Sequence, residues 1–236
     1  EGDGYIINGS KAYITAGASS DLAMIIAVTD PDQGKRGITA FITPTANPGY
    51  QVVRKEDKLG HRTVDTCEIR FDNMHVPASD VLGPVGKGLA IALANLSLGR
   101  IGVAAQATGG ARAAFEAAKA YAKERETFGQ KIISHQAIGF KLAEMSTYIE
   151  AARQMYLHAA DMHDKGLECV KEASMAKLFA SEMAEKVVSS AIQIHGGFGY
   201  LEDSAVAKIY RDVRVYQIYE GTSEVQKILI SRYLDT

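Results

Sequence analysis

The chain has only two cysteines, almost no net charge and no long hydrophobic run, and each absence excludes a class of protein. Cys67 and Cys169 lie too far apart in the sequence to suggest a disulfide framework or a metal cage. The 26 basic residues nearly balance the 28 acidic ones, and a net charge of −2 argues against nucleic acid or an anionic membrane surface as partner. No apolar run approaches the roughly 20 residues that a membrane-spanning helix needs.

The composition is that of an ordinary soluble globular protein. Of the 236 residues, 47% are hydrophobic and 23% are charged, which is enough to build one large domain or two smaller ones. Two isolated thiols suit a reducing compartment. The chain begins at Glu1, within a predicted strand and without a signal peptide, so we expect a piece of a longer protein.

The first third is predicted to be β-rich. Asn8-Gly9 indicates a two-residue hairpin turn, because both positions tolerate positive φ. The apolar stretch 22–28 predicts a strand buried on both faces, and residues 66–71 show the period-2 alternation of a half-buried strand. The strands are predicted at 5–7, 11–15, 22–28, 39–43 and 66–71.

The pattern changes from strands to helices across a stretch rich in glycine and proline, residues 72–88. We therefore predict two parts, residues 1–76 and residues 77–236. Apolar residues at steps of three and four, many of them alanine or glycine, predict helices that pack closely. The helices are expected at about 89–122, 136–165, 170–195, 204–213 and 224–233. Ser223 and Gln226 form a predicted capping box for the last one.

A carboxylate directly before the last helix is the sharpest chemical feature. Glu220 stands between Tyr219 and Gly221, and two interpretations remain open from spacing alone. An acidic residue at a helix N-terminus is stabilised by the helix dipole. Alternatively, a carboxylate beside apolar neighbours is suited to act as a general base.

Three further motifs each have a structural and a functional interpretation. Residues 195–200 form a glycine-rich turn between helices, or a place where backbone approaches a ligand closely. Arg125 is either a cation near a helix end or an arginine directed at a phosphate. Tyr13 and Thr15, two apart on a strand, are either packing residues or contacts to a planar cofactor. His195 has no second ligand at metal-binding spacing, so we predict no metal site.

Together and in this order, these motifs resemble one family, the acyl-CoA dehydrogenases. The resemblance covers nearly the whole chain. Its specific segments are residues 8–15, 71–77, 99–102, 125–130, 193–200 and 219–224. It implies an α+β fold, with a partial antiparallel β domain followed by a four-helix-bundle domain. It also implies that the family's N-terminal helical domain is absent from this chain.

The resemblance implies an FAD-dependent dehydrogenation between the α and β carbons of an acyl-CoA thioester. Glu220 matches the base that takes the α proton, while a hydride leaves the β carbon for flavin N5. The backbone N–H of Glu220 would be one donor to the thioester carbonyl, in a dry pocket that stabilises the enolate-like charge. Some relatives carry the base directly before the arginine of the earlier helix. Gly99 occupies that position here, so Glu220 is the single candidate.

The family also implies which residues bind FAD and substrate. Tyr13, where relatives usually have tryptophan, would stack near the flavin ring, and Arg125 would reach the pyrophosphate of a neighbouring subunit's FAD. The cofactor-binding residues implied are Tyr13, Ile14, Thr15, Arg125, Phe128, Gln136, Gln193, Ile194, His195, Gly196, Gly197, Thr222, Ser223 and Glu224. The substrate-binding residues implied are Ser97, Arg100 and Gly221.

The expected setting is fatty acid and lipid metabolism, in a bacterial cytoplasm or the mitochondrial matrix. The expected partners are an electron-transfer flavoprotein and further copies of the chain, as a homotetramer or homodimer. Two alternatives stay open: an acyl-CoA oxidase that uses oxygen, and a non-catalytic helical module that only oligomerises. The acyl chain length is not predicted.

Overall fold

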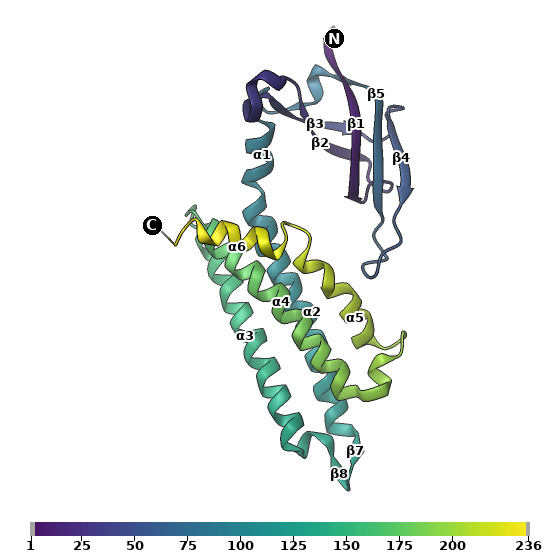
Figure 1. Cartoon of the computed structure of the whole chain (residues 1–236), viewed down its shortest axis with the longest axis vertical. Helices are drawn as coiled ribbons and strands as arrows, with labels where there is room; N and C mark the ends of the chain where they lie inside the picture. The colour runs from purple at the N-terminus through teal and green to yellow at the C-terminus, as the bar shows by residue number, and fades with distance from the viewer. Residues whose placement is uncertain (1–2, 235–236) are drawn as a thin grey trace. The chain divides into compact units, whose positions relative to one another are not determined.

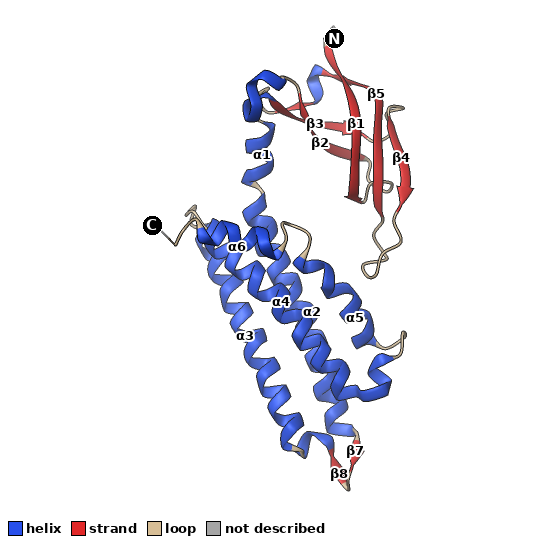
Figure 2. Cartoon of the chain, in the orientation of Figure 1, coloured by secondary structure: helices blue, strands red, loops and turns tan. Residues whose placement is uncertain are grey.

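The computed structural model describes residues 3–234, and the chain divides after Asn95 into two compact units. The first unit consists of two three-stranded antiparallel sheets, in the orders β1-β5-β4 and β2-β3-β6 (Figure 2). Their strands are β1 (Gly4–Thr15), β2 (Leu22–Val28), β3 (Ile38–Pro44), β4 (Tyr50–Lys55), β5 (Thr66–Pro77) and β6 (Val81–Leu82). The short helix α1 (Gly88–Ala94) packs against β2 and β3.

The core of the first unit confirms the alternation predicted for β5. Cys67, Ile69 and Phe71 are buried, and they pack in one cluster with Ile25 of β2 and Phe41 of β3. The period-2 pattern thus places one face of β5 against the hydrophobic core. β4 was not predicted, because Tyr50–Lys55 has exposed side chains at most positions.

Two predictions for this unit are wrong. Asn8-Gly9 is not a turn, because β1 continues through it and its pairing with β5 shifts register between Ile7 and Gly9. Between these two pairs β5 has one residue more than β1, and the extra residue forms a β-bulge. There the Asn8 side-chain oxygen accepts a hydrogen bond from the Asn73 N–H at 2.8 Å. The strand β2 is not buried on both faces, since Leu22 is 59% exposed and lies on an edge strand of its sheet.

The second unit is a helical bundle of α2 (Leu96–Glu124), α3 (Gln136–Asp164), α4 (Val170–His195) and α5 (Ala205–Val213). The two-stranded hairpin β7–β8 (Glu126–Thr127 and Gln130–Lys131) joins α2 to α3 at one end of the bundle. The last helix, α6 (Ser223–Ser231), packs against α4 toward the other end of the bundle (Figure 1). The predicted helices 136–165 and 170–195 are confirmed to within one residue.

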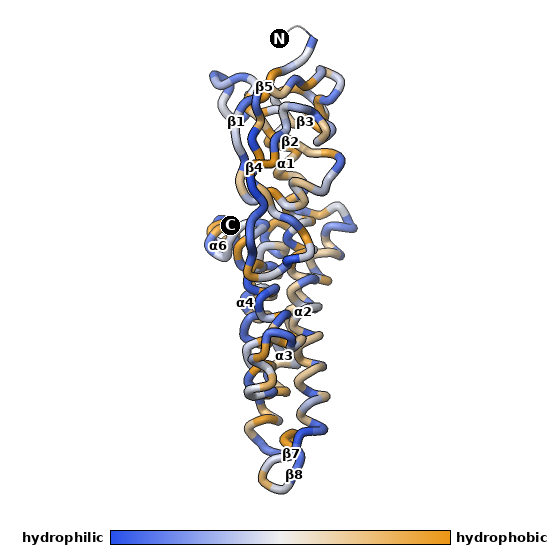
Figure 3. The backbone as a smooth tube through the Cα atoms, turned by 90° about the vertical axis from the view of Figure 1, so that its right-hand side faces the viewer, coloured by the Kyte–Doolittle hydropathy of each residue, from blue (hydrophilic) through white to orange (hydrophobic). Residues whose placement is uncertain are grey.

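Small side chains form the interface between α2 and α4. Ala107 and Ala111 of α2 and Ala180 and Ala184 of α4 are completely buried in the same cluster. Alanine at the contact allows neighbouring helices to approach closely. Along the bundle helices, hydrophobic positions are interrupted by hydrophilic ones (Figure 3).

The sequence analysis found no apolar run long enough to span a membrane, but one helical segment passes a test of length and composition. Residues 88–124, α1 and α2 taken together, are long and apolar enough to cross a membrane by length and composition alone. Core helices of globular bundles pass the same test, and α2 contributes buried alanines to the bundle core.

The two compact units divide after Asn95, whereas the sequence predicted the division between residues 76 and 77.

Candidate active site

The carboxylate of Glu220 lies on a short loop between the 3-10 turn η5 (Arg214–Gln217) and α6. Its backbone is left-handed, with φ of 53° at Glu220 and 89° at Gly221. A non-glycine residue in this region is uncommon and is kept there only where the surroundings support it. The Glu220 side chain is exposed, so the loop presents the carboxylate outward from the bundle.

Hydrogen bonds from α6 and α4 hold the inner side of this loop. The Gln226 amide donates to the Glu220 carbonyl at 3.1 Å and to the Gly221 carbonyl at 2.8 Å. The ammonium of Lys177, on α4, donates to the same Gly221 carbonyl at 2.7 Å. Both side chains are completely buried. The loop carbonyls thus point into the bundle and the Glu220 side chain points out.

The capping box predicted at Ser223 is wrong. Thr222 is the N-cap of α6, and its hydroxyl accepts from the Val225 N–H at 3.4 Å, while Ser223 is already helical and buried. Gln226 does not reach back to cap the helix, because its amide is taken by the loop carbonyls.

Two buried cations lie below the loop. Arg100 of α2 is 6% exposed, and its Nε has no hydrogen-bond partner among the described residues. Burial lowers the pKa of Arg100, and the negative charge of Glu220 partly opposes this. Burial also lowers the pKa of Lys177 to about 8, again opposed by Glu220. Both cations therefore interact electrostatically with Glu220.

Gly99 leaves the space that the Glu220 carboxylate occupies. A Cβ added at Gly99 would lie 2.4 Å from Glu220 Oε2. The first turn of α2 and the loop before α6 therefore meet at this carboxylate. Beside it, the Tyr219 hydroxyl donates to the Gln106 side chain at 2.7 Å, and burial raises the pKa of Tyr219.

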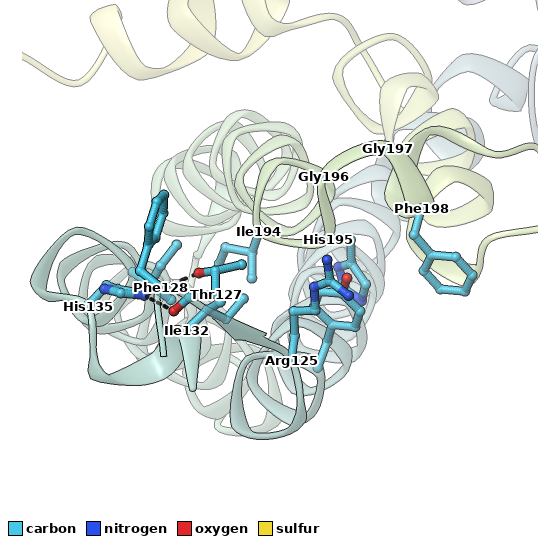
Figure 4. Close-up of a pocket in the computed structure, with 12 residues that line it drawn as sticks. Arg125, Thr127, Phe128, Ile132, His135, Ile194, His195, Gly196, Gly197 and Phe198 are labelled. Carbon is cyan, nitrogen blue, oxygen red and sulfur yellow. Dashed lines mark hydrogen bonds between the residues drawn. The ribbon is translucent and has the colours of Figure 1, made fainter. Parts of the chain in front are cut away.

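A separate pocket of about 630 Å³ lies near the β7–β8 end of the bundle (Figure 4). It brings together Arg125 and Phe128, from the segment after α2, with Ile194–Gly197 at the end of α4. Phe128 is 95% exposed with a φ of 52°, and Arg125 is also exposed. The pocket thus combines an accessible guanidinium, an accessible aromatic ring and glycine backbone.

Aromatic rings form one wall of this pocket. His195 stacks on Tyr121 with ring centroids 4.6 Å apart, and Phe198 stacks on Tyr121 at 6.2 Å. The His195 Nδ1 lies 2.8 Å from the Ala191 carbonyl, so this histidine is anchored to its own helix. On the opposite side, His135 lies 3.2 Å from the Thr127 hydroxyl.

Other predicted site residues do not line this pocket. Gln136 and Gln193 are exposed beside it, on the first turn of α3 and the last turn of α4. In the first unit, Tyr13 is 76% exposed, with a φ of 59°, at an irregularity in the pairing of β1 with β5. Ile14 and Thr15 follow it on β1. Ser97 is half-buried one turn before Arg100, and Glu224 is exposed on α6.

Sequence models of known families match both units of the chain. The acyl-CoA dehydrogenase middle domain matches residues 1–74, and the acyl-CoA dehydrogenase C-terminal domain matches residues 86–234. The chain belongs to the acyl-CoA dehydrogenase family. Members of this family are flavoproteins that use FAD.

Individual relatives agree over nearly the whole chain. An acyl-CoA dehydrogenase of Bacillus subtilis is 53% identical over 98% of this chain and 61% of its own length. The caffeyl-CoA reductase–Etf complex subunit CarC of Acetobacterium woodii is 44% identical over 99% of this chain and 62% of its own length. The structure of butyryl-CoA dehydrogenase from Megasphaera elsdenii has a TM-score of 0.97 at 44% identity, covering 100% of this chain and 62% of that one. The chain thus spans about three-fifths of the length of these relatives.

Sequence reasoning missed three residues, two in the surroundings of Glu220 and one in the pocket near the β7–β8 hairpin. Lys177 carries a readable signal, because it is a lysine in the buried register of an alanine-rich helix, beside Ala173, Ala176 and Ala180. Gln226 was assigned to a cap instead of the loop. Tyr121 carries no signal that distinguishes it from an ordinary half-buried tyrosine of a helix.

We predict that Gly221→Ala destabilises the fold by about 1 kcal/mol or more, because Gly221 has a φ that alanine adopts with strain. The added Cβ would also lie 2.8 Å from the Gln226 amide nitrogen. Urea denaturation measures the change in the free energy of unfolding. The control is Gly102→Ala on α2, where a Cβ meets nothing within 4 Å, and a gain of about 0.5–1 kcal/mol is expected. Equal effects of the two substitutions would contradict the prediction.

Proposed function

We propose that the protein containing this chain catalyses the FAD-dependent α,β-dehydrogenation of an acyl-CoA thioester. The observation that carries the proposal is the Glu220 carboxylate, exposed on a left-handed loop, supported from inside by Gln226 and Lys177 and accommodated by Gly99. Family membership supports it, since the same loop segment carries the resemblance to the family's base. The acyl-CoA relatives support a thioester as substrate.

Glu220 would take a proton from the α carbon of the thioester. An α C–H beside a thioester is a weak acid, so the reaction needs both a positioned base and donors to the carbonyl oxygen. The backbone N–H of Glu220 would be one such donor. Arg100 and Lys177 are buried cations that interact electrostatically with this carboxylate.

The pocket at the β7–β8 end fits part of an FAD molecule. Arg125 offers a bidentate cation for a pyrophosphate, Gly196 and Gly197 offer accessible backbone, and Phe128 offers an exposed ring. Ile194 and His195 would line the same part of the cofactor, with Gln193 and Gln136 at its edge. When bound, FAD supplies the acceptor for the two electrons of the reaction.

One flavin cannot contact both the Glu220 loop and the pocket that contains Arg125 within one copy of the bundle. Arg100 lies near the start of α2 and Arg125 directly follows its last residue, roughly 37 Å away at about 1.5 Å per residue. We infer that Glu220 and the Arg125 pocket serve different FAD molecules, so that Arg125 and Phe128 reach the FAD of a neighbouring subunit. A homodimer or homotetramer follows from this sharing. Tyr13, Ile14 and Thr15, with Thr222, Ser223 and Glu224, would contact the FAD of their own subunit, and Ser97, Arg100 and Gly221 the substrate.

An electron-transfer flavoprotein is the proposed electron acceptor. The CarC relative is named as a subunit of an Etf complex, which supports this partner. The test is anaerobic bleaching of the flavin absorbance by a panel of acyl-CoA esters, followed by addition of the flavoprotein or of oxygen. Reoxidation by the flavoprotein supports the proposal, whereas rapid reoxidation by oxygen alone would indicate an oxidase. A protein without flavin, or with flavin that no ester bleaches, would refute the proposed function.

We predict that Glu220→Gln retains FAD but loses flavin bleaching by at least about a thousandfold, because the amide cannot accept the α proton. Stopped-flow absorbance at the flavin maximum gives the rate. Glu116→Gln, on the exposed surface of α2, is the matched control and should bleach like the wild type. Bleaching of Glu220→Gln at a near-normal rate would exclude Glu220 as the base.

We predict that Gly99→Ala slows bleaching by about 10–100-fold while the fold and the FAD content stay unchanged. The new methyl group would displace the Glu220 carboxylate, which is the mobile end of an exposed side chain, and a misplaced base reacts slowly. Gly102→Ala, less than one turn further along α2, should have no such effect. An unchanged rate in Gly99→Ala would mean that the carboxylate reacts from another position.

We predict that Arg125→Ala weakens FAD retention by at least about tenfold, because a charge-assisted contact to the pyrophosphate is lost. The measurement is the dissociation constant of FAD from the purified oligomer. Arg112→Ala, which removes an exposed arginine of the preceding helix α2, serves as control and should retain FAD. Equal FAD affinity in both variants would contradict the phosphate role of Arg125.

A further inference from the structure

Lys177 is a charged residue in a place that disfavours charge. Its side chain is completely buried on α4, on the face that also carries Ala173, Ala176 and Ala180. Among residues 3–234, its ammonium has one hydrogen-bond acceptor, the Gly221 carbonyl at 2.7 Å. Transfer of an ammonium from water to such a site is unfavourable unless the ion is well paired.

The stability of the fold does not explain this lysine. An apolar side chain of similar length would fill the same space without the desolvation cost. The Gly221 carbonyl would keep a second donor, the Gln226 amide at 2.8 Å. A buried group whose titration is perturbed and that is not needed for packing is typical of a functional site.

The charges around Lys177 come from four elements. Glu220 is on the loop before α6, Arg100 on α2, Glu182 on α4 and Glu224 on α6. Glu220 is the largest of the electrostatic influences on Lys177, and Arg100 opposes it. The ammonium and the Glu220 carboxylate are therefore held on the same side of α4 and attract each other.

We propose that Lys177 is a positioning residue, whose ammonium fixes the Gly221 carbonyl and thereby keeps the neighbouring Glu220 in the orientation of a base. This role rests on the proposed function of Glu220. In this role Lys177 assists proton abstraction, while its burial lowers the stability of the fold. Replacing it should slow proton abstraction without lowering the free energy of unfolding at pH 7.

The pH dependence of stability reports the burial of Lys177 without any activity. Its pKa is lowered from 10.5 to about 8, so between pH 8 and 10.5 the unfolded chain binds more protons than the folded one. Folding stability gained from this group therefore increases as the pH rises through that window. A Lys177→Met variant should be at least as stable as the wild type at pH 7, and its advantage should shrink by pH 10.

The test compares Lys177→Met with Lys186→Met in the flavin-loaded protein. Lys186 is an exposed lysine of the same helix, so its loss controls for the change in net charge. Thermal unfolding is measured at pH 7 and 10. The rate of flavin bleaching is measured at pH 7 over a range of concentrations of an acyl-CoA that reduces the wild type. If Lys177→Met fails to fold, Lys177→Gln, which keeps a donor without the charge, replaces it.

Lys177→Met is expected to keep its FAD and its melting temperature at pH 7. It should bleach at least about tenfold more slowly at saturating acyl-CoA, while the acyl-CoA concentration that gives the half-maximal rate stays unchanged. Lys186→Met should match the wild type throughout. Wild-type bleaching in Lys177→Met, or slower bleaching together with a loss of melting temperature or a raised half-saturating acyl-CoA concentration, would overturn the positioning role. A wild type that no acyl-CoA bleaches would instead overturn the proposed function, and this role with it.

Discussion

The candidate active site depends on the left-handed backbone at Glu220 and Gly221. Two consecutive positive φ values turn the loop carbonyls into the bundle, where Gln226 and Lys177 donate to them, and turn the Glu220 carboxylate outward. Backbone strain of this kind persists only where surrounding contacts hold it. Without the buried donors, the carbonyls would lack partners inside the bundle and the loop would relax away from this conformation.

The small residues of the bundle decide what can lie next to that loop. Alanine at the α2–α4 interface allows the helices to pack closely, and Gly99 on the first turn of α2 leaves space for the Glu220 carboxylate. The same close packing excludes water from Arg100 and Lys177, which makes their charges effective toward Glu220. The small side chains of α2 and α4 therefore determine both the close packing at this site and the burial of its two cations.

Sequence reasoning was most successful where periodicity was long. The helices from Gln136 and from Val170 have many turns of buried alanine and apolar residues, so the pattern outweighs local uncertainty. It failed where one residue type suits several structures. Asn8-Gly9 serves a bulge as readily as a hairpin turn, and Gln226 serves a loop carbonyl as readily as a capping box.

The amino-acid sequence by itself determined the helical bundle and, through motifs along the whole chain, the resemblance to the family. Glu220 as the candidate base and the grouping of Arg125 with residues 194–197 came from that resemblance, and the structure places Arg125 and residues 194–197 around one pocket. The tertiary structure alone decided that Gly99 faces the Glu220 carboxylate, that Lys177 and Arg100 are buried beneath it, and that Gln226 binds the loop. These contacts join residues 40 or more positions apart, or depend on a backbone conformation, and no local pattern encodes the distance between two folded segments.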